Sequence, residues 1–178
     1  NYTQSHSHRV SKIAEMIARQ MKLNAFDIEN IRVAALLHDL GKVGVSEAVL
    51  QKVTDLTAQE RVHMRQHTWM AVNMLEPLGE TVGDILPIIL HHHEKYDGSG
   101  YYKAAREDIP LGARIIAVAD VYDSLTSDRP YRKAFSSLQA KQEINANSQT
   151  HFDPRVVAAF NAIFPYLETD SYLLAGAG

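Results

Sequence analysis

Hydrophobic positions recur along most of this chain with the three-to-four-residue spacing of an α-helix. The first such series faces one side of a single helix and comprises Val10, Ile13, Ala14, Ile17, Ala18 and Met21. His6 lies four residues before Val10 and therefore on the same side, which we expect to be buried, whereas His8 points elsewhere. The pattern predicts an amphipathic helix that carries one histidine toward the core.

The same spacing predicts six further helices. One begins at the capping box that Thr57 and Glu60 form, and the others cover residues 27–40, 82–92, 110–124, 136–147 and 153–166. Gly41 is expected to end the helix over 27–40. Segment 94–108 contains Asp97-Gly98-Ser99-Gly100 and is predicted to be a long surface loop. No segment alternates as a strand does, so we expect a single all-α domain over residues 1–178.

Composition narrows the class of protein. Hydrophobic residues make up 46% and charged residues 22%, as in globular proteins, and no window approaches the ~18 apolar residues of a membrane span. The formal charge of −3 gives no basic surface for duplex nucleic acid. The absence of cysteine excludes disulfides and thiolate metal sites and is compatible with a reducing cytosol. The chain begins at Asn1 without a signal-peptide pattern, from which we expect a domain taken from a longer protein.

The nine histidines are what composition leaves unexplained, and the sharpest motif among them is His38-Asp39-Leu40-Gly41-Lys42. Adjacent helical residues lie ~100° apart, so His38 and Asp39 can hold one metal ion or two neighbouring ions. A carboxylate offers two oxygens for bridging, and imidazole suits Zn, Fe, Mn or Ni. Gly41 permits a sharp turn that keeps Lys42 near an anionic substrate. In isolation, the pair would be no more than a capped helix end.

Other histidines and carboxylates accompany this motif. His67 shares a helix face with apolar residues, and residues 91–93 are three consecutive histidines. Burial of such groups without partners costs several kcal/mol, so they are either ligands or a solvated helix end. Asp120 follows the apolar run 115–119 and is therefore paired or metal-bound if buried. Asp123 lies three residues later on the same side, with a partly exposed helix end as the alternative.

Together these motifs resemble the HD-GYP domain, a branch of the HD metal-dependent phosphohydrolases. The resemblance runs from Ser5 to about Phe164 and rests on His6, His38–Lys42, His67, His92–Glu94, Asp97–Tyr101, Ala119–Asp123, Asp128–Arg132 and Thr150–Val157. It implies a bacterial, cytoplasmic helical bundle that hydrolyses cyclic dinucleotides, chiefly cyclic di-GMP, by attack of a hydroxide that bridges metal ions. It also implies an upstream sensor or receiver domain, and the full-length protein could be tethered to a membrane.

The resemblance further implies the role of each site residue. The implied metal ligands are His6, His38, Asp39, His67, His92, His93 and Asp120, with Asp39 as the bridge. Lys42 would neutralise charge on the phosphoryl oxygens, while Tyr101, Asp123, Arg129 and Arg132 would contact the substrate. A solvated face is the alternative for the two arginines. His91 is the extra histidine, and surface or packing roles are expected for His8, His63 and His151.

The sequence departs from the family pattern in two places. Gly-Tyr-Pro reads Gly100-Tyr101-Tyr102, and segment 103–108 lacks the usual glycines. Because proline fixes φ near −65°, we expect Tyr102 to loosen or re-route a loop that places substrate or binds a protein partner. Tyr2 stands where three-metal members carry Glu, and a phenol of pKa ~10 is a poor ligand. Two divalent ions are therefore expected, with Fe or Mn favoured over Zn, Ni or Co.

Three functions are compatible with these residues. The first is a cyclic-dinucleotide phosphodiesterase, and the second is an HD phosphatase acting on another nucleotide. The third is a weak or inactive module that acts by protein interaction or ligand sensing. The complete ligand set with Lys42 favours an enzyme, and segment 97–101 with the two arginines favours the phosphodiesterase.

Overall fold

The computed structural model describes residues 2–128 and 133–169, except for the side chains of residues 2–4. The helices are α1 (Tyr2–Gln20), α2 (Ala25–Leu37), α3 (Glu47–Leu50), α4 (Ala58–Leu75), α5 (Leu86–His91), α6 (Leu111–Thr126), α7 (Ser137–Ala146) and α8 (Pro154–Thr169), with the short 3₁₀ helices η1 (Leu40–Gly44), η2 (Glu76–Thr81) and η3 (Arg106–Asp108). The described residues contain one isolated bridge, between Ser148 and Phe152, and no strand. The all-α prediction is confirmed.

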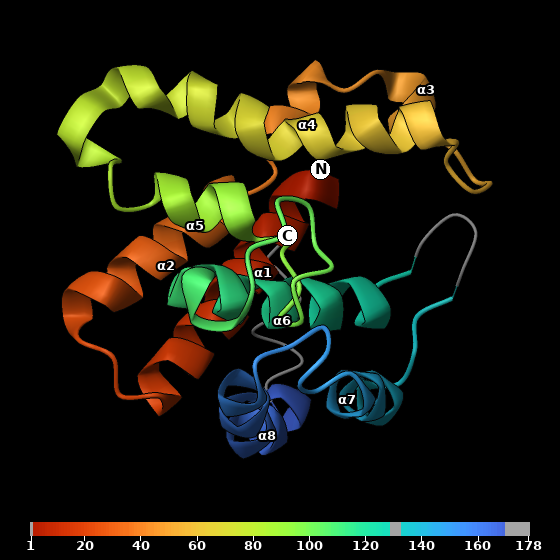
Figure 1. Cartoon of the computed structure of the whole chain (residues 1–178). Helices are drawn as coiled ribbons and strands as arrows, with labels where there is room; N and C mark the ends of the chain where they lie inside the picture. Colours follow the sequence, from red (N-terminus) through yellow and green to blue (C-terminus); the bar gives the residue numbers. More distant parts are fainter. Residues whose placement is uncertain (1, 129–132, 170–178) are drawn as a thin grey trace.

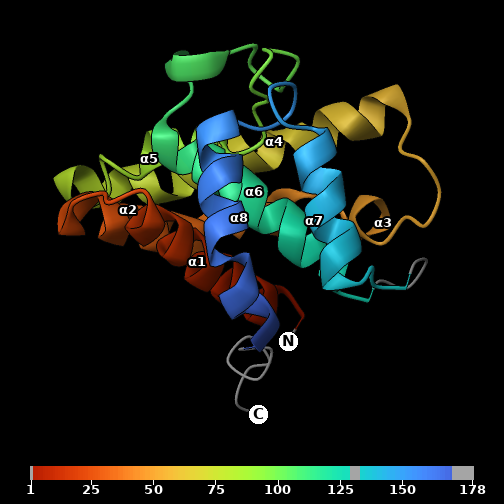
Figure 2. The ribbon, with the colours of Figure 1, turned by 90° about the horizontal axis from the view of Figure 1, so that it is seen from below.

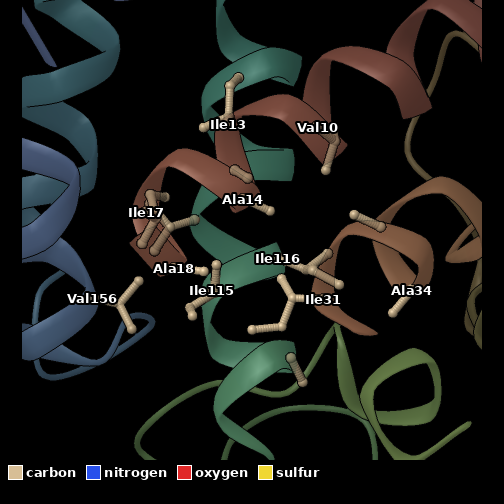
Figure 3. Close-up of a cluster of buried hydrophobic side chains, with 14 of the residues drawn as sticks. Val10, Ile13, Ala14, Ile17, Ala18, Ile31, Ala34, Ile115, Ile116 and Val156 are labelled. Carbon is tan, nitrogen blue, oxygen red and sulfur yellow. The ribbon is translucent and has the colours of Figure 1, made fainter. Parts of the chain in front are cut away.

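Helix α6 is the centre of the bundle and contacts α1, α2, α5, α7 and α8. In Figure 1, α4 and α5 lie on one side of α6 and α7 and α8 on the other, and Figure 2 shows α7 and α8 from below. Figure 3 shows Ile115 on the side of Val156 and Ala18, and Ile116 on the side of Ile31. Both isoleucines are fully buried, and each stabilises the fold by roughly 1.5–3 kcal/mol.

Side-chain caps fix where several helices begin. The Glu60 amide donates to Thr57 Oγ1 at 3.2 Å and the Thr57 amide donates to Glu60 Oε2 at 2.7 Å, which confirms the predicted capping box. Asp153 Oδ1 accepts from the Arg155 amide at 2.8 Å, at the beginning of α8. These local bonds explain why the sequence pattern located both helix starts correctly.

The predicted helix over 27–40 ends earlier, at Leu37, and Gly41 lies inside η1. A Cβ at Gly41 would lie 1.9 Å from the carbonyl oxygen of His67 and 2.6 Å from the Ala71 amide nitrogen. Gly41 therefore serves as a close packing point between η1 and α4 and not as a helix cap. Helix α5 also begins later than the predicted residue 82, and the sequence pattern missed α3.

Segment 94–108 is irregular apart from η3, as predicted, and it is tied to the turn before α8. The Tyr96 amide donates to the His151 carbonyl at 3.0 Å, and the Asp97 amide donates to the Thr150 carbonyl at 2.9 Å. Lys103 and Arg106 have φ of 64° and 51°, a left-handed conformation that glycine would adopt without strain. None of the described helices has both the length and the apolarity that a membrane crossing requires.

Candidate metal centre

Seven His and Asp side chains converge where α1, α4, α5, α6 and the α2–η1 junction meet. Their ligand atoms lie within 4.8 Å of one another in three groups: His67, His92 and His93; His6, His38 and Asp120; and His38, Asp39 and His92. The first two groups share no residue, and the third connects them. The groups contain the seven ligands implied by the resemblance and no other described residue. Imidazole and carboxylate donors this close together can hold divalent metal ions.

Asp39 lies between the two outer groups. Its Oδ2 is 3.6 Å from His38 Nε2 and 3.9 Å from His6 Nε2, whereas its Oδ1 is 3.8 Å from His67 Nε2. Burial raises the pKa of Asp39, but the nearby His38 and Lys42 outweigh burial and lower it. Each oxygen of an ionised carboxylate therefore faces a different set of histidines, which is the arrangement that a bridging ligand needs.

Three of the histidines are fixed in one tautomer by backbone carbonyls of their own helices. Each Nδ1 donates to the carbonyl three residues earlier at 2.6 Å: His38 to Ala35, His67 to Met64 and His92 to Ile89. Because Nδ1 carries the proton, Nε2 of each ring presents its lone pair to the centre. The rings are therefore oriented before any ion binds.

The lone pairs at the centre need a cation. His38 Nε2 is buried without a hydrogen-bond partner, and His67 Nε2 lies 3.4 Å from His92 Nε2, so two acceptors face each other. Burial lowers the pKa of His67, lowers that of His92 further, and lowers that of His93 to about 4. Neutral imidazoles are the form that binds divalent metals, so this donor set fits such ions.

His6 is held from both sides by carboxylates. Its Nδ1 donates to Asp123 Oδ2 at 2.7 Å, and its Nε2 lies 3.3 Å from Asp120 Oδ1. Burial lowers the pKa of His6, but the bonds to Asp120 and Asp123 raise it to about 9. The buried Asp123 also accepts two hydrogen bonds from Arg9, one from Nε to Oδ1 at 2.5 Å and one from Nη2 to Oδ2 at 3.0 Å. Asp123 thus lies behind His6, which favours an orienting role over the expected substrate contact.

Lys42 and Tyr101 lie at the rim of the centre. Lys42 Nζ donates to Asp39 Oδ2 at 2.7 Å, and the lysine side chain is 35% exposed. A cavity of about 590 Å³ adjoins Asp39 and Lys42 and has Leu40 and Val43 among its walls. The Tyr101 ring centre lies 5.0 Å from that of His93. These residues place a cation, an aromatic ring and an apolar hollow beside the ligand cluster.

Some expected residues take no part in the cluster or are not described. Arg129 and Arg132 lie outside the described residues, as does the side chain of Tyr2. His91 donates to the Pro87 carbonyl of its own helix at 2.9 Å, and His151 stacks on Phe152 with ring centres 4.3 Å apart.

Sequence reasoning missed Arg9 and Arg65. Arg9 lies three residues after His6 and so on the same side of α1, which was an available signal. Arg65, whose guanidinium lies 5.0 Å from the Tyr101 ring centre, has no local signal, because only the fold brings the loop to it.

Comparison with known proteins identifies the family. The HD domain family pattern matches residues 2–156. The chain is 39% identical over 160 residues to the cyclic di-GMP phosphodiesterase PA4108 of Pseudomonas aeruginosa, covering 89% of this chain and 38% of that protein. It is 35% identical over 157 residues to the 3′3′-cGAMP-specific phosphodiesterase 2 of Vibrio cholerae, covering 87% and 30%. The chain therefore spans less than half the length of these relatives.

Solved structures share the fold. Bd1817, described as a HDG"Y"P protein from Bdellovibrio bacteriovorus, superposes with a TM-score of 0.75 at 16% identity, over 92% of this chain and 52% of that one. The cyclic GMP-AMP-specific phosphodiesterase V-cGAP3 of V. cholerae superposes with a TM-score of 0.69 at 21% identity, over 97% and 46%. The chain belongs to the HD domain family, in the HD-GYP branch that its motifs resemble.

Proposed function

We propose that this chain is a metal-dependent phosphodiesterase domain that hydrolyses cyclic di-GMP or a related cyclic dinucleotide. The observation that carries the proposal is the convergence of seven His and Asp ligands in two groups with Asp39 between them. The names of the relatives, which act on cyclic di-GMP or 3′3′-cGAMP, support the substrate class.

Two divalent ions are the proposed cofactor. His67, His92 and His93 would hold one ion, His6, His38 and Asp120 would hold the other, and Asp39 would contact both. Fe and Mn are favoured, and the same imidazole and carboxylate donors also suit Zn, Ni or Co. When bound, such ions would lower the pKa of a water and offset negative charge on the phosphodiester.

The remaining side chains bind and orient. Lys42 offers its ammonium to the phosphoryl oxygens from the rim, and the adjoining cavity has room for part of a nucleotide, since ligand pockets span about 300–1,000 Å³. Tyr101 presents a ring for stacking, while Asp123 and Arg9 keep the His6 ring in place. Substrate contacts of Arg129 and Arg132, an upstream sensor or receiver domain and a protein partner at segment 94–108 are proposed from the resemblance alone.

A turnover assay tests this function. Protein reconstituted with Fe(II) or Mn(II) should hydrolyse cyclic di-GMP or 3′3′-cGAMP, and Asp39→Asn should abolish the activity. His63→Ala is the matched control, because His63 belongs to none of the ligand groups. A reconstituted protein that neither turns over nor binds either dinucleotide would overturn the proposal in favour of an interaction module.

A further inference from the structure

Tyr102 replaces the proline of the family motif, and its side chain extends from segment 94–108 to contact helix α4. Its Oη lies 2.7 Å from Oγ1 of the fully buried Thr68. Thr68 Oγ1 also lies 3.2 Å from the Arg65 carbonyl oxygen, to which it donates its only proton. The Tyr102 hydroxyl is therefore the donor in the bond to Thr68, and the bond joins the loop to α4 one residue after the ligand His67.

The backbone of Tyr102 is held as well. Its amide donates to Glu94 Oε1 at 2.6 Å, and Glu94 is 2% exposed. On the other side of Tyr101, a Cβ at Gly100 would lie 2.6 Å from Glu94 Cα and from the Lys95 amide nitrogen. The loop is thus clamped immediately before and immediately after Tyr101. A proline at residue 102 has no amide proton and would lose the bond to Glu94.

Tyr101 is the residue that this clamp places. The centre of its ring lies 5.0 Å from that of the His93 ring, and the Arg65 guanidinium lies over the Tyr101 ring, 5.0 Å from its centre. Arg65 and Thr68 are three residues apart on α4 and face the same side. One face of α4 therefore supplies both the tether for Tyr102 and the cation over Tyr101.

We propose that Tyr102 is a positioning residue: its hydroxyl bond to Thr68 and its amide bond to Glu94 replace the restraint of proline and hold Tyr101 at the rim of the metal centre. The inference rests on the proposed function, because Tyr101 is taken to contact the cyclic dinucleotide there. Of the two expected effects of Tyr102, these bonds argue against a loosened loop, whereas a re-routed loop stays a prediction.

Three variants separate the two bonds. Tyr102→Phe removes the hydroxyl alone, and Thr68→Val removes its partner with little change of shape. Each should raise KM for cyclic di-GMP roughly three- to tenfold, the range of one net hydrogen bond, with kcat, metal content and Tm close to wild type. The double variant should have a KM no higher than that of either single variant, because both substitutions remove the same hydrogen bond. Tyr102→Pro should be worse than Tyr102→Phe, because the buried Glu94 carboxylate then loses the partner of Oε1 as well.

Tyr96→Phe is the matched control, because it removes a hydroxyl from the same loop. The Tyr96 hydroxyl lies 3.4 Å from Glu107, a residue of this loop, whereas the partner of the Tyr102 hydroxyl is on α4. Its KM should stay at the wild-type value. Additive effects of Tyr102→Phe and Thr68→Val, a fall in Tm with unchanged KM, or rescue by Tyr102→Pro would each overturn the proposal.

Amide hydrogen exchange tests the tether without turnover. Exchange over residues 99–103 should become faster in Tyr102→Phe and in Thr68→Val but not in Tyr96→Phe, and unchanged exchange would overturn the tether. If wild type fails to hydrolyse any cyclic dinucleotide while exchange responds as expected, the proposed function fails and the tether stands.

Discussion

At the residue scale, the chemistry of this site depends on pairs in which one side chain fixes another. Nδ1 of His38, His67 and His92 is bonded to a helix carbonyl, and Nδ1 of His6 is bonded to Asp123. Such partners set which nitrogen is free and where it points. A substitution should therefore act according to the atoms that the residue presents to the centre and not merely according to its charge.

Asp39 presents one oxygen toward each outer group, so its loss should affect both metal positions. Asp39→Ala should lose metal from both positions, whereas His6→Ala should weaken one position more than the other. Elemental analysis of metal per chain, after dialysis against graded chelator, measures the difference. An equal loss in the two variants would exclude Asp39 as the bridge.

Lys42 should separate the chemistry from metal binding. Lys42→Ala should leave metal content and folding nearly unchanged, while kcat/KM falls by ~10²–10³ if its ammonium stabilises the transition state. Lys52→Ala is the control, because Lys52 forms an ion pair with Glu60 at 2.6 Å outside the cluster. Turnover, metal content and Tm are measured on the same preparations. Full activity of Lys42→Ala would remove this residue from the catalytic machinery.

The seven side chains that converge are those that the family resemblance implied, and several of them also stand out locally in the sequence. Asp120 follows an apolar run, and His38 and Asp39 end an amphipathic helix. The positions of Arg9 and Asp123 on their own helices had a local signal, but the contact between them had none. Arg9 and Asp123 are far apart in sequence, and their pairing depends on how α1 packs on α6. The convergence of these residues agrees with the expectation, their roles as metal ligands stay a prediction, and the contacts that give Asp123 its place were missed.

At the element scale, η1 packs closely against α4, and this contact brings Asp39 toward His67. Gly41→Ala should disrupt it, because the added Cβ would meet backbone atoms that cannot move aside. We expect a loss of about 1–3 kcal/mol or more in unfolding free energy, with weaker metal binding. Gly83→Ala is the control, since its Cβ would lie 3.7 Å from the nearest atom. Denaturant unfolding measures both, and equal stability of the two variants would contradict the role of Gly41.

Element boundaries show the limit of local pattern. The helix start at Thr57 is set by bonds within four residues, so the sequence predicted it. Helix α2 ends at Leu37, and the chain continues into η1, which lies against α4 at Gly41. No local signal reveals this contact, and the predicted helix ran too long. The same reason accounts for Tyr102, whose partner Thr68 lies on another helix.

At the scale of the whole molecule, α8 is fastened to α6 by a buried ion pair. Arg114 Nη1 donates to Asp153 Oδ2 at 2.6 Å, with the two side chains 9% and 0% exposed. The turn before Asp153 also binds segment 94–108 through two backbone bonds. This pair therefore connects the central helix with the beginning of the last helix, next to the turn that binds the loop carrying Tyr101.

Asp153→Ala should destabilise the fold by about 3–5 kcal/mol, because it leaves Arg114 buried without its counter-charge. Arg155→Ala should cost far less, since the Arg155 side chain is 56% exposed.

Burial raises the pKa of Asp153, but its bonds to Arg155 and Arg114 outweigh burial and lower it. The ionised form of Asp153 thus stabilises the protein fully at pH values above the ordinary aspartate pKa of about 3.9. This contribution is lost as the pH falls through the lower pKa of the folded state. Urea unfolding of wild type and Asp153→Asn from pH 7 to pH 3 should give a shallower pH dependence for the variant, and parallel curves would show that Asp153 does not supply this stability.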